Sequence, residues 1–140
     1  MARATPHDRF SSEVALTPAQ VRKYARAVGD TNPVHHDSTV AAASRFGGLI
    51  ASGTHTTALL LGLTAFHFSA TGPMLGLDFW VQFRRPIFAN ERIRLEWLVV
   101  RVTSSSRLRG EVVELRGRIQ GADGRTAVGA KGRVLLSATH

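Results

Sequence analysis

The segment at residues 58–68 constrains the fold more than any other, because a glycine, a threonine and a histidine are the only breaks in its apolar run. We expect a helix that begins at Ser52 or Gly53 and continues through Phe68, about 24 Å long at roughly 1.5 Å per residue. The apolar run is well short of the roughly 20 residues that span a bilayer. A helix that is apolar on nearly every side must be buried, so the rest of the chain is expected to wrap around it.

The sequence after this helix predicts the structure that wraps it. Charged and apolar residues alternate there, which is typical of strands with one solvated face. The predicted strands cover residues 75–86, 91–103, 107–120 and 125–137. Asp123 and Gly124 suit a hairpin turn between the last two strands. Helices followed by consecutive antiparallel strands predict the α+β class, with an antiparallel sheet wrapped around one long central helix.

A capping box marks the first predicted helix. Thr17 fits the N-cap, Pro18 suits the first helical position, and Gln20 completes the box. Gly29 is expected to end this helix, so that Asp30 lies at its C-terminal end. The remaining predicted elements are a strand at 10–16 and a short helix at 38–43 that is capped by Asp37 or Ser38.

Length and composition limit the class of protein. A chain of 140 residues has the usual size of one domain, so we expect residues 1–140 to form a single domain in which residues 1–9 are flexible. Hydrophobic residues at 44% and charged residues at 20% are typical of soluble folded proteins. The absence of cysteine excludes disulfides and cysteine metal sites. The first ten residues have no apolar core like that of a signal peptide, so we expect a cytoplasmic protein without a membrane partner.

The chain is strongly basic, with a formal net charge of +8. Most of its arginines lie in the alternating segments, so we interpret them chiefly as the solvated face of a sheet. A polyanionic ligand such as the phosphates of coenzyme A is the second interpretation. Nucleic acid is third and is not expected as a partner, because the chain has no basic run and no recognised reading motif.

The loop at residues 30–37 holds the first candidate catalytic pair. Asp30 and His35 lie on either side of Pro33, whose ring stiffens the backbone, and Asn32 can hydrogen-bond the surrounding loop. A carboxylate and an imidazole in a stiff turn can act together on one water molecule. The alternative is structural: Asp30 begins an Asx turn and His35 is a surface or hydrogen-bonded histidine.

The start of the long helix supplies a second candidate. A glycine-rich loop at 46–48 precedes it, and backbone N–H groups near Gly53 and Thr54 are suited to hold a carbonyl oxygen that gains negative charge. The alternative for Gly53 is that it only permits the turn before a buried helix.

Three segments resemble the MaoC-like dehydratases, a family that includes the (R)-specific enoyl-CoA hydratases. They are YARAVGDTNPVH at 24–35, FGGLIASG at 46–53 and FRRPI at 83–87, and the resemblance extends over about residues 15–135. The family implies a hotdog fold, a homodimer or dimer-based oligomer, and an active site near the subunit interface. It also implies reversible hydration of a trans-2-enoyl-CoA or acyl-carrier-protein thioester to a 3-hydroxyacyl thioester, without metal or redox cofactor.

The same resemblance assigns roles to residues. Asp30 and His35 would activate the water, and the backbone N–H of Gly53 would polarise the thioester carbonyl. His36 is a rival for the imidazole role, but the motif spacing selects His35. Two departures bear on the substrate: Ser52 stands where several relatives have histidine, and 89–91 replaces a Gly-Asp turn.

Other residues are candidates for substrate binding or for the core. Asn32, Ser52, Thr54 and His55 lie beside the predicted catalytic residues, although a hydrogen-bonded core histidine is the alternative for His55. Helical spacing puts His55 about 18 Å from His67, too far apart to share a metal. Arg84 and Arg85 could meet coenzyme A phosphates or simply be solvated. The aromatic residues expected in the core or at a dimer interface are Phe79, Trp80, Phe83, Phe88 and Trp97.

Three functions therefore follow from the sequence. The principal hypothesis is an acyl-thioester hydratase or dehydratase, a hydro-lyase. The alternatives are a hotdog acyl-CoA thioesterase and a non-catalytic subunit that binds acyl thioesters. Acyl chain length, the choice between coenzyme A and a carrier protein, and the stereochemistry are left open.

Overall fold

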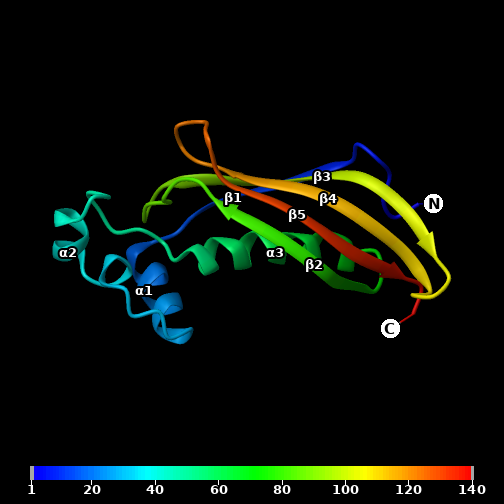
Figure 1. The fold of residues 1–140 in the computed structure, drawn as a ribbon, viewed down its shortest axis with the longest axis horizontal. Coiled ribbons are helices and arrows are strands. Elements are labelled where there is room, and N and C mark those ends of the chain that lie inside the picture. The colour runs from blue at the N-terminus through cyan, green and yellow to red at the C-terminus, as the bar shows by residue number, and fades with distance from the viewer. Residues whose placement is uncertain (1, 140) are drawn as a thin grey trace.

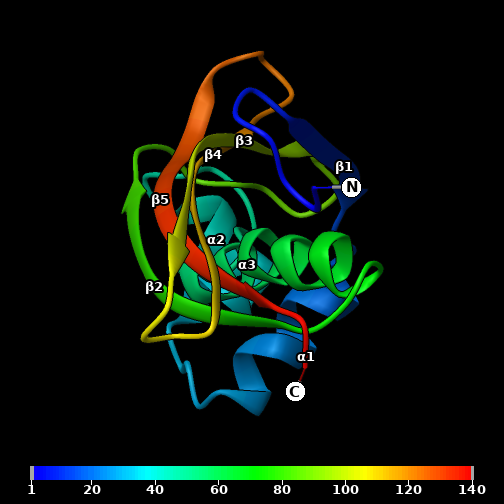
Figure 2. The same ribbon diagram turned by 90° about the vertical axis from the view of Figure 1, so that its right-hand side faces the viewer.

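A curved antiparallel sheet lies over one long helix, as Figures 1 and 2 show. The computed structural model describes residues 2–139. The five strands are β1 (Arg9–Ala15), β2 (Met74–Phe83), β3 (Arg92–Ser105), β4 (Gly110–Gln120) and β5 (Thr126–Ser137). Their order in the sheet is β1-β3-β4-β5-β2, so the first two strands of the chain form the two edges. This arrangement confirms the predicted α+β class.

The helices are α1 (Pro18–Ala27), the single 3-10 turn η1 (Pro33–His35), α2 (Ser38–Ala43) and α3 (Gly53–Ser69). The first three gather at one end of the molecule, beyond the end of the sheet, while α3 runs beneath the sheet (Figure 1). Thr17 caps α1 in the predicted capping box. Asp37, and not Ser38, caps α2, since its carboxylate accepts from the N–H groups of Thr39 and Val40.

The long helix is covered on one side only. Leu60, Leu63 and Phe68 are buried against the sheet, and the indole N–H of Trp97 on β3 donates to the carbonyl of Leu60 at 2.8 Å. On the opposite side Phe66 is 80% exposed. The predicted wrapping is therefore confirmed for the side of the helix that faces the sheet, and the opposite side has no such cover within residues 2–139. None of the helices in the described chain is long and apolar enough to cross a bilayer.

The strand boundaries differ from the predicted ones where contacts between distant segments intervene. The strand expected at 75–86 ends at Phe83, because the N–H groups of Arg84 and Arg85 both turn to the carbonyl of Ala127. The turn expected at 104–106 lies at 106–109, so β3 extends to Ser105 and β4 begins three residues later than predicted. The hairpin at Asp123 and Gly124 is confirmed, with Gly124 at φ +83°.

The segment before β1 forms no strand, but the sheet holds it. The Arg3 guanidinium donates to the carbonyls of Phe68, Pro73 and Ser137, and the N–H of His7 donates to the carbonyl of Val99. Ala4 is buried in the core. These contacts fix the segment over the C-terminal end of α3.

The two faces of the sheet follow the predicted alternation. On β3 the side chains of Ile93, Leu95 and Trp97 are buried, while Arg94 between them is exposed. Of the aromatic residues expected in the core or an interface, Trp97 is fully buried, whereas Trp80 and Phe83 on β2 are 54% and 55% exposed. The arginines of the strands, such as Arg94, are therefore on the solvated face of the sheet, as predicted.

Gly117 on β4 makes room for the central tryptophan. A Cβ atom at this position would lie 2.5 Å from Trp97 Cε3, and the indole is fully buried, so it has no space into which to move. Gly62 on α3 is the contrasting case, because a Cβ there would meet nothing within 4 Å.

We predict that Gly117→Ala lowers the free energy of unfolding by about 1–3 kcal/mol through overpacking against Trp97. The matched control, Gly62→Ala, should raise it by up to about 1 kcal/mol, because alanine favours the helix more than glycine does. Urea unfolding followed by circular dichroism measures both. Equal stability of the two variants would contradict this account of the core.

Candidate active site

The end of α1 delivers Asp30 to the site. Gly29 adopts φ +75°, a conformation that reverses the chain, and the N–H of Asp30 then donates to the carbonyl of Ala25 at 2.9 Å. After this turn, Asn32 caps η1 through its side-chain oxygen, which accepts from Val34, and Pro33 takes the first position of the short helix. Asn32 thus holds the loop, as the sequence predicts.

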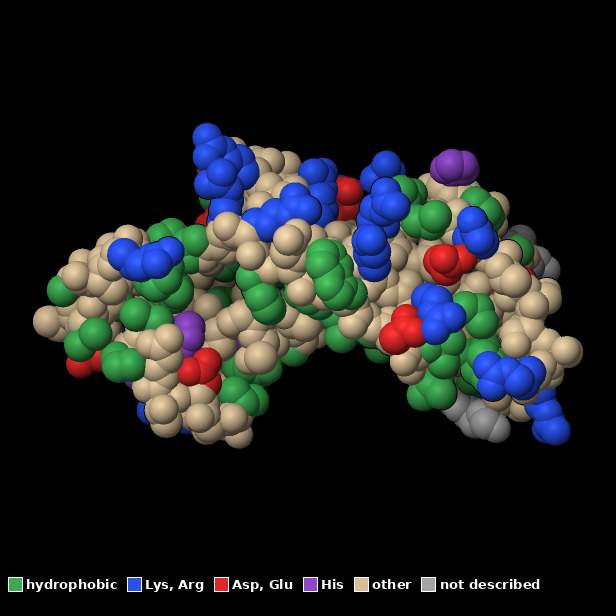
Figure 3. Space-filling model, in the orientation of Figure 1, with side chains coloured by type: hydrophobic (Ala, Val, Ile, Leu, Met, Phe, Trp, Pro, Cys, Tyr) green, Lys and Arg blue, Asp and Glu red, His purple; other side chains and the backbone are tan. Residues whose placement is uncertain are grey.

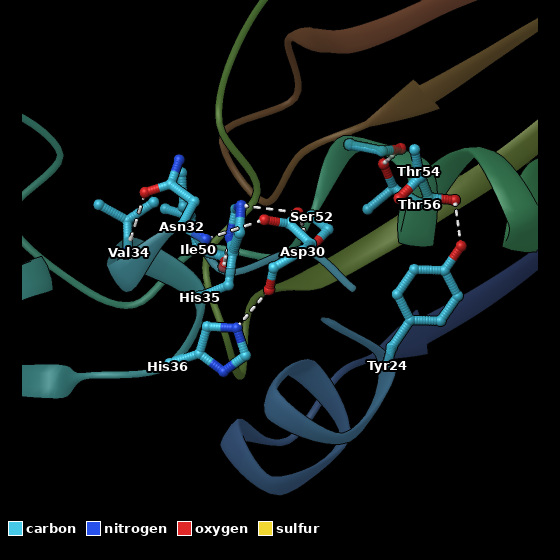
Figure 4. Close-up of polar contacts among 11 residues, drawn as sticks. Tyr24, Asp30, Asn32, Val34, His35, His36, Ile50, Ser52, Thr54 and Thr56 are labelled. Atoms are coloured by element: carbon cyan, nitrogen blue, oxygen red, sulfur yellow. Dashed lines mark hydrogen bonds and ion pairs between the residues drawn. The ribbon is translucent and has the colours of Figure 1, made fainter. Parts of the chain in front are cut away.

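The Asp30 carboxylate has three partners (Figure 4). Its Oδ1 accepts the backbone N–H of Asn32 at 3.1 Å, its Oδ2 accepts the Ser52 hydroxyl at 2.9 Å, and His35 Nε2 lies 3.4 Å from Oδ2. Burial alone would raise the pKa of Asp30. The hydrogen bonds from Asn32 and Ser52, with the nearby His35 and His36, outweigh burial and lower that pKa overall. Asp30 is therefore a carboxylate at neutral pH.

The orientation of His35 is set by a backbone carbonyl. The ring is buried, and its Nδ1 lies 2.8 Å from the carbonyl oxygen of Ile50. A carbonyl can only accept, so Nδ1 carries a proton, and Nε2 is the ring nitrogen that faces the Asp30 carboxylate. The 3.4 Å between Nε2 and the carboxylate exceeds an ordinary hydrogen bond. A water molecule beside the pair can donate one proton to each.

His36 occupies a different position from His35. Its Nε2 hydrogen-bonds the backbone carbonyl of Asp30, not the carboxylate, and Arg22 Nε donates to the carbonyl of His36 at 2.8 Å. These two hydrogen bonds hold the turn between Asp30 and His36. Of the two imidazoles, His35 is therefore the one that faces the Asp30 carboxylate.

The first turn of α3 points uncapped N–H groups toward the site. Ser52 is the N-cap residue and is almost fully buried, but its hydroxyl donates to Asp30 and makes no capping bond. Within residues 2–139, the backbone N–H groups of Gly53 and Thr54 have no acceptor. The N-terminus of a helix carries partial positive charge, so these N–H groups can hold an oxygen that becomes negative.

A pocket of about 340 Å³ joins these features. His35 and Gly53 both line it, together with Phe46, Phe83 and Arg85 among others, whereas Asp30 is not among its lining residues. Figure 3 shows this hollow between the helical end and the sheet. A Cβ at position 53 would lie 3.0 Å from the Phe83 ring, so glycine is needed there for close approach.

The structure separates the predicted substrate-binding residues into two groups. Arg84 and Arg85 line the pocket. Asn32, Ser52, Thr54 and His55 do not belong to its lining. Ser52 instead contacts Asp30, and the carbonyl of Thr54 accepts the hydroxyl of Tyr24 at 3.0 Å.

His55 is buried, but it is not the hydrogen-bonded histidine that the sequence led us to expect. Its ring stacks on Tyr24 with centroids 4.2 Å apart, and its Nδ1 has no hydrogen-bond partner among the described residues. Burial lowers the pKa of His55, so the ring is neutral at neutral pH. The His55 ring is held by stacking on Tyr24 of α1 instead of by the expected hydrogen bond.

Three contributors to the site were missed from the sequence. The Ile50 carbonyl orients His35, the Phe83 ring closes on Gly53, and Tyr24 fastens α1 to the start of α3. The residue type at position 50 does not indicate what its backbone carbonyl will contact. The Phe83 contact joins segments 30 residues apart in the chain, so it has no local sequence pattern. Tyr24 was detectable, since its helical register places it on the buried side of α1 next to Val21 and Ala25.

Residues 3–118 match the family described as "MaoC like domain". The chain belongs to this family. A "UPF0336 protein" of Streptomyces avermitilis is 28% identical to this MaoC-like chain over 134 residues, covering 86% of the chain and 83% of the relative. A "3-hydroxyacyl-thioester dehydratase Z" of Mycobacterium tuberculosis is 34% identical over 87 residues, covering 60% of the chain and 58% of the relative.

Solved structures establish the fold of this MaoC-like chain. An (R)-hydratase from A. caviae involved in PHA biosynthesis superposes with a TM-score of 0.85 at 23% identity, covering 95% of this chain and 97% of that one. R-hydratase PhaJ1 from Pseudomonas aeruginosa gives a TM-score of 0.84 at 21% identity, with coverage of 96% and 83%. The predicted hotdog fold is confirmed.

We predict that Ser52→Ala moves the acidic limb of the pH–rate profile to higher pH. A carboxylate can act as a base only while it is ionised, so an activity that uses Asp30 as the base falls as pH drops through its pKa, and loss of the Ser52 hydroxyl raises that pKa. Ser52→Thr, which keeps a hydroxyl, should retain the wild-type limb. The readout is kcat/KM against pH with an enoyl-CoA; an unmoved limb in Ser52→Ala would show that the hydrogen bond does not tune Asp30.

Proposed function

We propose that this protein is an acyl-thioester hydratase/dehydratase that adds water reversibly to a trans-2-enoyl-CoA and gives a 3-hydroxyacyl-CoA. The observation that carries the proposal is the arrangement of three groups: His35 Nε2, the Asp30 carboxylate that it faces, and the open N–H of Gly53, which lines the same pocket as His35. Membership of the MaoC-like family supports it. The names of two similar proteins, an (R)-hydratase and a 3-hydroxyacyl-thioester dehydratase, support it as well.

The first step is activation of water. A water molecule that donates to both His35 Nε2 and Asp30 Oδ2 has its oxygen lone pairs turned away from the pair and toward the pocket. As that oxygen bonds to C3 of the substrate, the pair takes up one proton. The Ile50 carbonyl holds the His35 ring in place during this transfer and stabilises it when it becomes charged.

The second requirement is a place for the electrons that leave the double bond. They move onto the thioester oxygen, which becomes an enolate, and the N–H of Gly53 at the positive end of α3 hydrogen-bonds that oxygen. The pair then returns its proton to C2. One hydroxyl has been added to C3 and one hydrogen to C2, and Asp30 and His35 are back in their starting states. Each proton transfer in these steps goes to or from the Asp30 and His35 pair.

We predict that Asp30→Asn and His35→Ala each lower kcat/KM for hydration of crotonyl-CoA or a longer enoyl-CoA by about 10²–10⁴-fold, the usual contribution of a general acid or base. Loss of absorbance by the conjugated thioester measures the rate. The matched control is Glu111→Gln on β4, which removes a carboxylate charge that makes no contact with the site. His36→Ala should cost far less than His35→Ala.

Two outcomes would overturn the assignment. Release of free thiol from a saturated acyl-CoA, with no hydration of enoyl-CoA, would identify a thioesterase. Tight binding of acyl-CoA without turnover across a panel of chain lengths would identify a binding subunit. The panel should include branched and dicarboxylic acyl groups, and chiral analysis of the product gives the stereochemistry.

We also propose that the protein works as a homodimer. Within the described chain β2 pairs only with β5, so its other edge is open, and the exposed side of α3 carries Phe66. An open strand edge and an exposed aromatic on an apolar helix both favour association with another copy. A second copy would supply the cover that the sheet leaves off α3.

Phe66→Glu is expected to convert the dimer to a monomer, because it places a charge where the second copy covers α3. Size-exclusion chromatography with light scattering measures the mass. The control is Val100→Glu, which alters a 44% exposed apolar residue on β3, away from α3. A dimer that survives Phe66→Glu, or a wild-type monomer, would reject this interface.

A further inference from the structure

The outer face of the sheet carries a depression that the proposed chemistry does not use. Strand register aligns one row of residues across all five strands: Arg9, Leu98, Arg116, Lys131 and Trp80. In the neighbouring row Gly129 lies between Arg118 and Gln82. Because Gly129 has no side chain, the Arg84 guanidinium lies close over the sheet there, with its nearest nitrogen 3.5 Å from where a Cβ would be, and the depression that both residues line measures about 570 Å³. That volume lies within the range of ordinary small-molecule sites.

The depression has more positive charge than its carboxylate can balance. Glu96 is the acidic residue in its lining, and it already contacts Arg9, Arg94 and Arg118. Among residues 2–139, no carboxylate pairs with Arg84, Arg116 or Lys131, all of which line the depression. Three cations without carboxylate partners around one hollow are suited to phosphate groups.

An exposed aromatic ring borders the same hollow. Trp80 is 54% exposed, and Lys131 Nζ lies 5.5 Å from its ring centroid. An exposed indole beside cations is the combination that holds a planar base together with its phosphates. Figure 3 shows basic side chains gathered over the sheet, with exposed hydrophobic side chains between them.

The depression adjoins the active-site pocket. Arg84 lines both cavities. Phe83, which closes on Gly53, is three residues along β2 from Trp80, so about 10 Å separates them at the rise of a strand. The two rings lie on opposite faces of the sheet, so a ligand that reaches both passes the end of β2 at Arg84. An extended pantetheine arm spans on the order of 14 Å, judged by the reach of a peptide chain with as many backbone atoms. A thioester at Gly53 can therefore place the far end of its carrier over Gly129.

We propose that this depression binds the 3′-phosphorylated ADP end of coenzyme A, with the adenine on Trp80 and the phosphates at Arg84, Arg116 and Lys131. The proposal rests on the proposed function, since it takes an acyl-CoA as the substrate. A hollow of small-molecule size beside an aromatic ring favours a nucleotide over the surface of an acidic carrier protein, which would need charge but neither the hollow nor the ring.

The first test measures binding without any reaction. Titration with adenosine 3′,5′-bisphosphate should change the tryptophan fluorescence, because Trp80 is exposed whereas Trp97 is fully buried. Arg116→Ala with Lys131→Ala should weaken the apparent affinity by on the order of tenfold or more. The matched control is Arg107→Ala, which removes the same kind of charge from the β3–β4 turn, outside the depression. Equal affinity in wild type and the double variant would overturn the site.

The second test separates this site from the chemistry. The double variant should raise KM for crotonyl-CoA on the order of tenfold with kcat little changed, while wild type and variant converge on crotonyl-pantetheine, which lacks the nucleotide. An equal loss on both substrates would overturn the proposal, as would a loss confined to carrier-protein thioesters. Nucleotide binding that depends on Arg116 and Lys131, in a protein that hydrates no enoyl-CoA, would support the site and reject the proposed function.

Discussion

The hydrogen bond from Ser52 to Asp30 is the interaction on which the rest of the site depends. It joins the loop after α1 to the first turn of α3, two segments that the chain brings together from 22 residues apart. In its observed orientation this hydroxyl donates to Asp30 and accepts no N–H group of the helix. Its use on the carboxylate helps to lower the pKa of Asp30 and leaves the N–H groups of α3 without a side-chain cap. One side chain thereby bears on both the pKa of the proposed base and the availability of the proposed oxyanion donors.

The rigidity of α3 gives this junction its precision. Trp97 bonds the Leu60 carbonyl and fills the space opposite Gly117, so the helix is tied to the centre of the sheet. Its N-terminus then meets the end of β2, where Phe83 approaches Gly53. Asp30 and His35 lie in a loop, but Asn32, Ile50 and Ser52 each hold them by a hydrogen bond. The proposed oxyanion donors are thus positioned by the core, and the proposed acid–base pair by its neighbours.

The features that the sequence predicted correctly are those with a local cause. The capping box at Thr17, the stiff turn around Pro33 and the alternation along β3 each depend on residues close together in the chain. What the sequence hid depends on pairing between distant segments: the carbonyl of Ala127 ends β2 early, and the carbonyl of Ile50 fixes the His35 tautomer. The uncovered side of α3 was also hidden, because apolarity predicts burial without naming the chain that provides it.

Basic residues line both cavities, and this gives a physical reason for the net positive charge of the chain. Arg84, which lines both cavities, lies where a polyanionic carrier would leave the pocket, while Asp30 is outside the pocket lining. A phosphate-bearing substrate would therefore be attracted at its far end without bringing its charge against the proposed base. Long-range attraction would concentrate at the depression over Gly129, and the reacting end would enter a site whose charge is set by burial, hydrogen bonds and the neighbouring histidines. Substitutions can then alter substrate binding and catalysis separately, because the residues of the depression and those of the pocket lie on opposite faces of the sheet at the same edge.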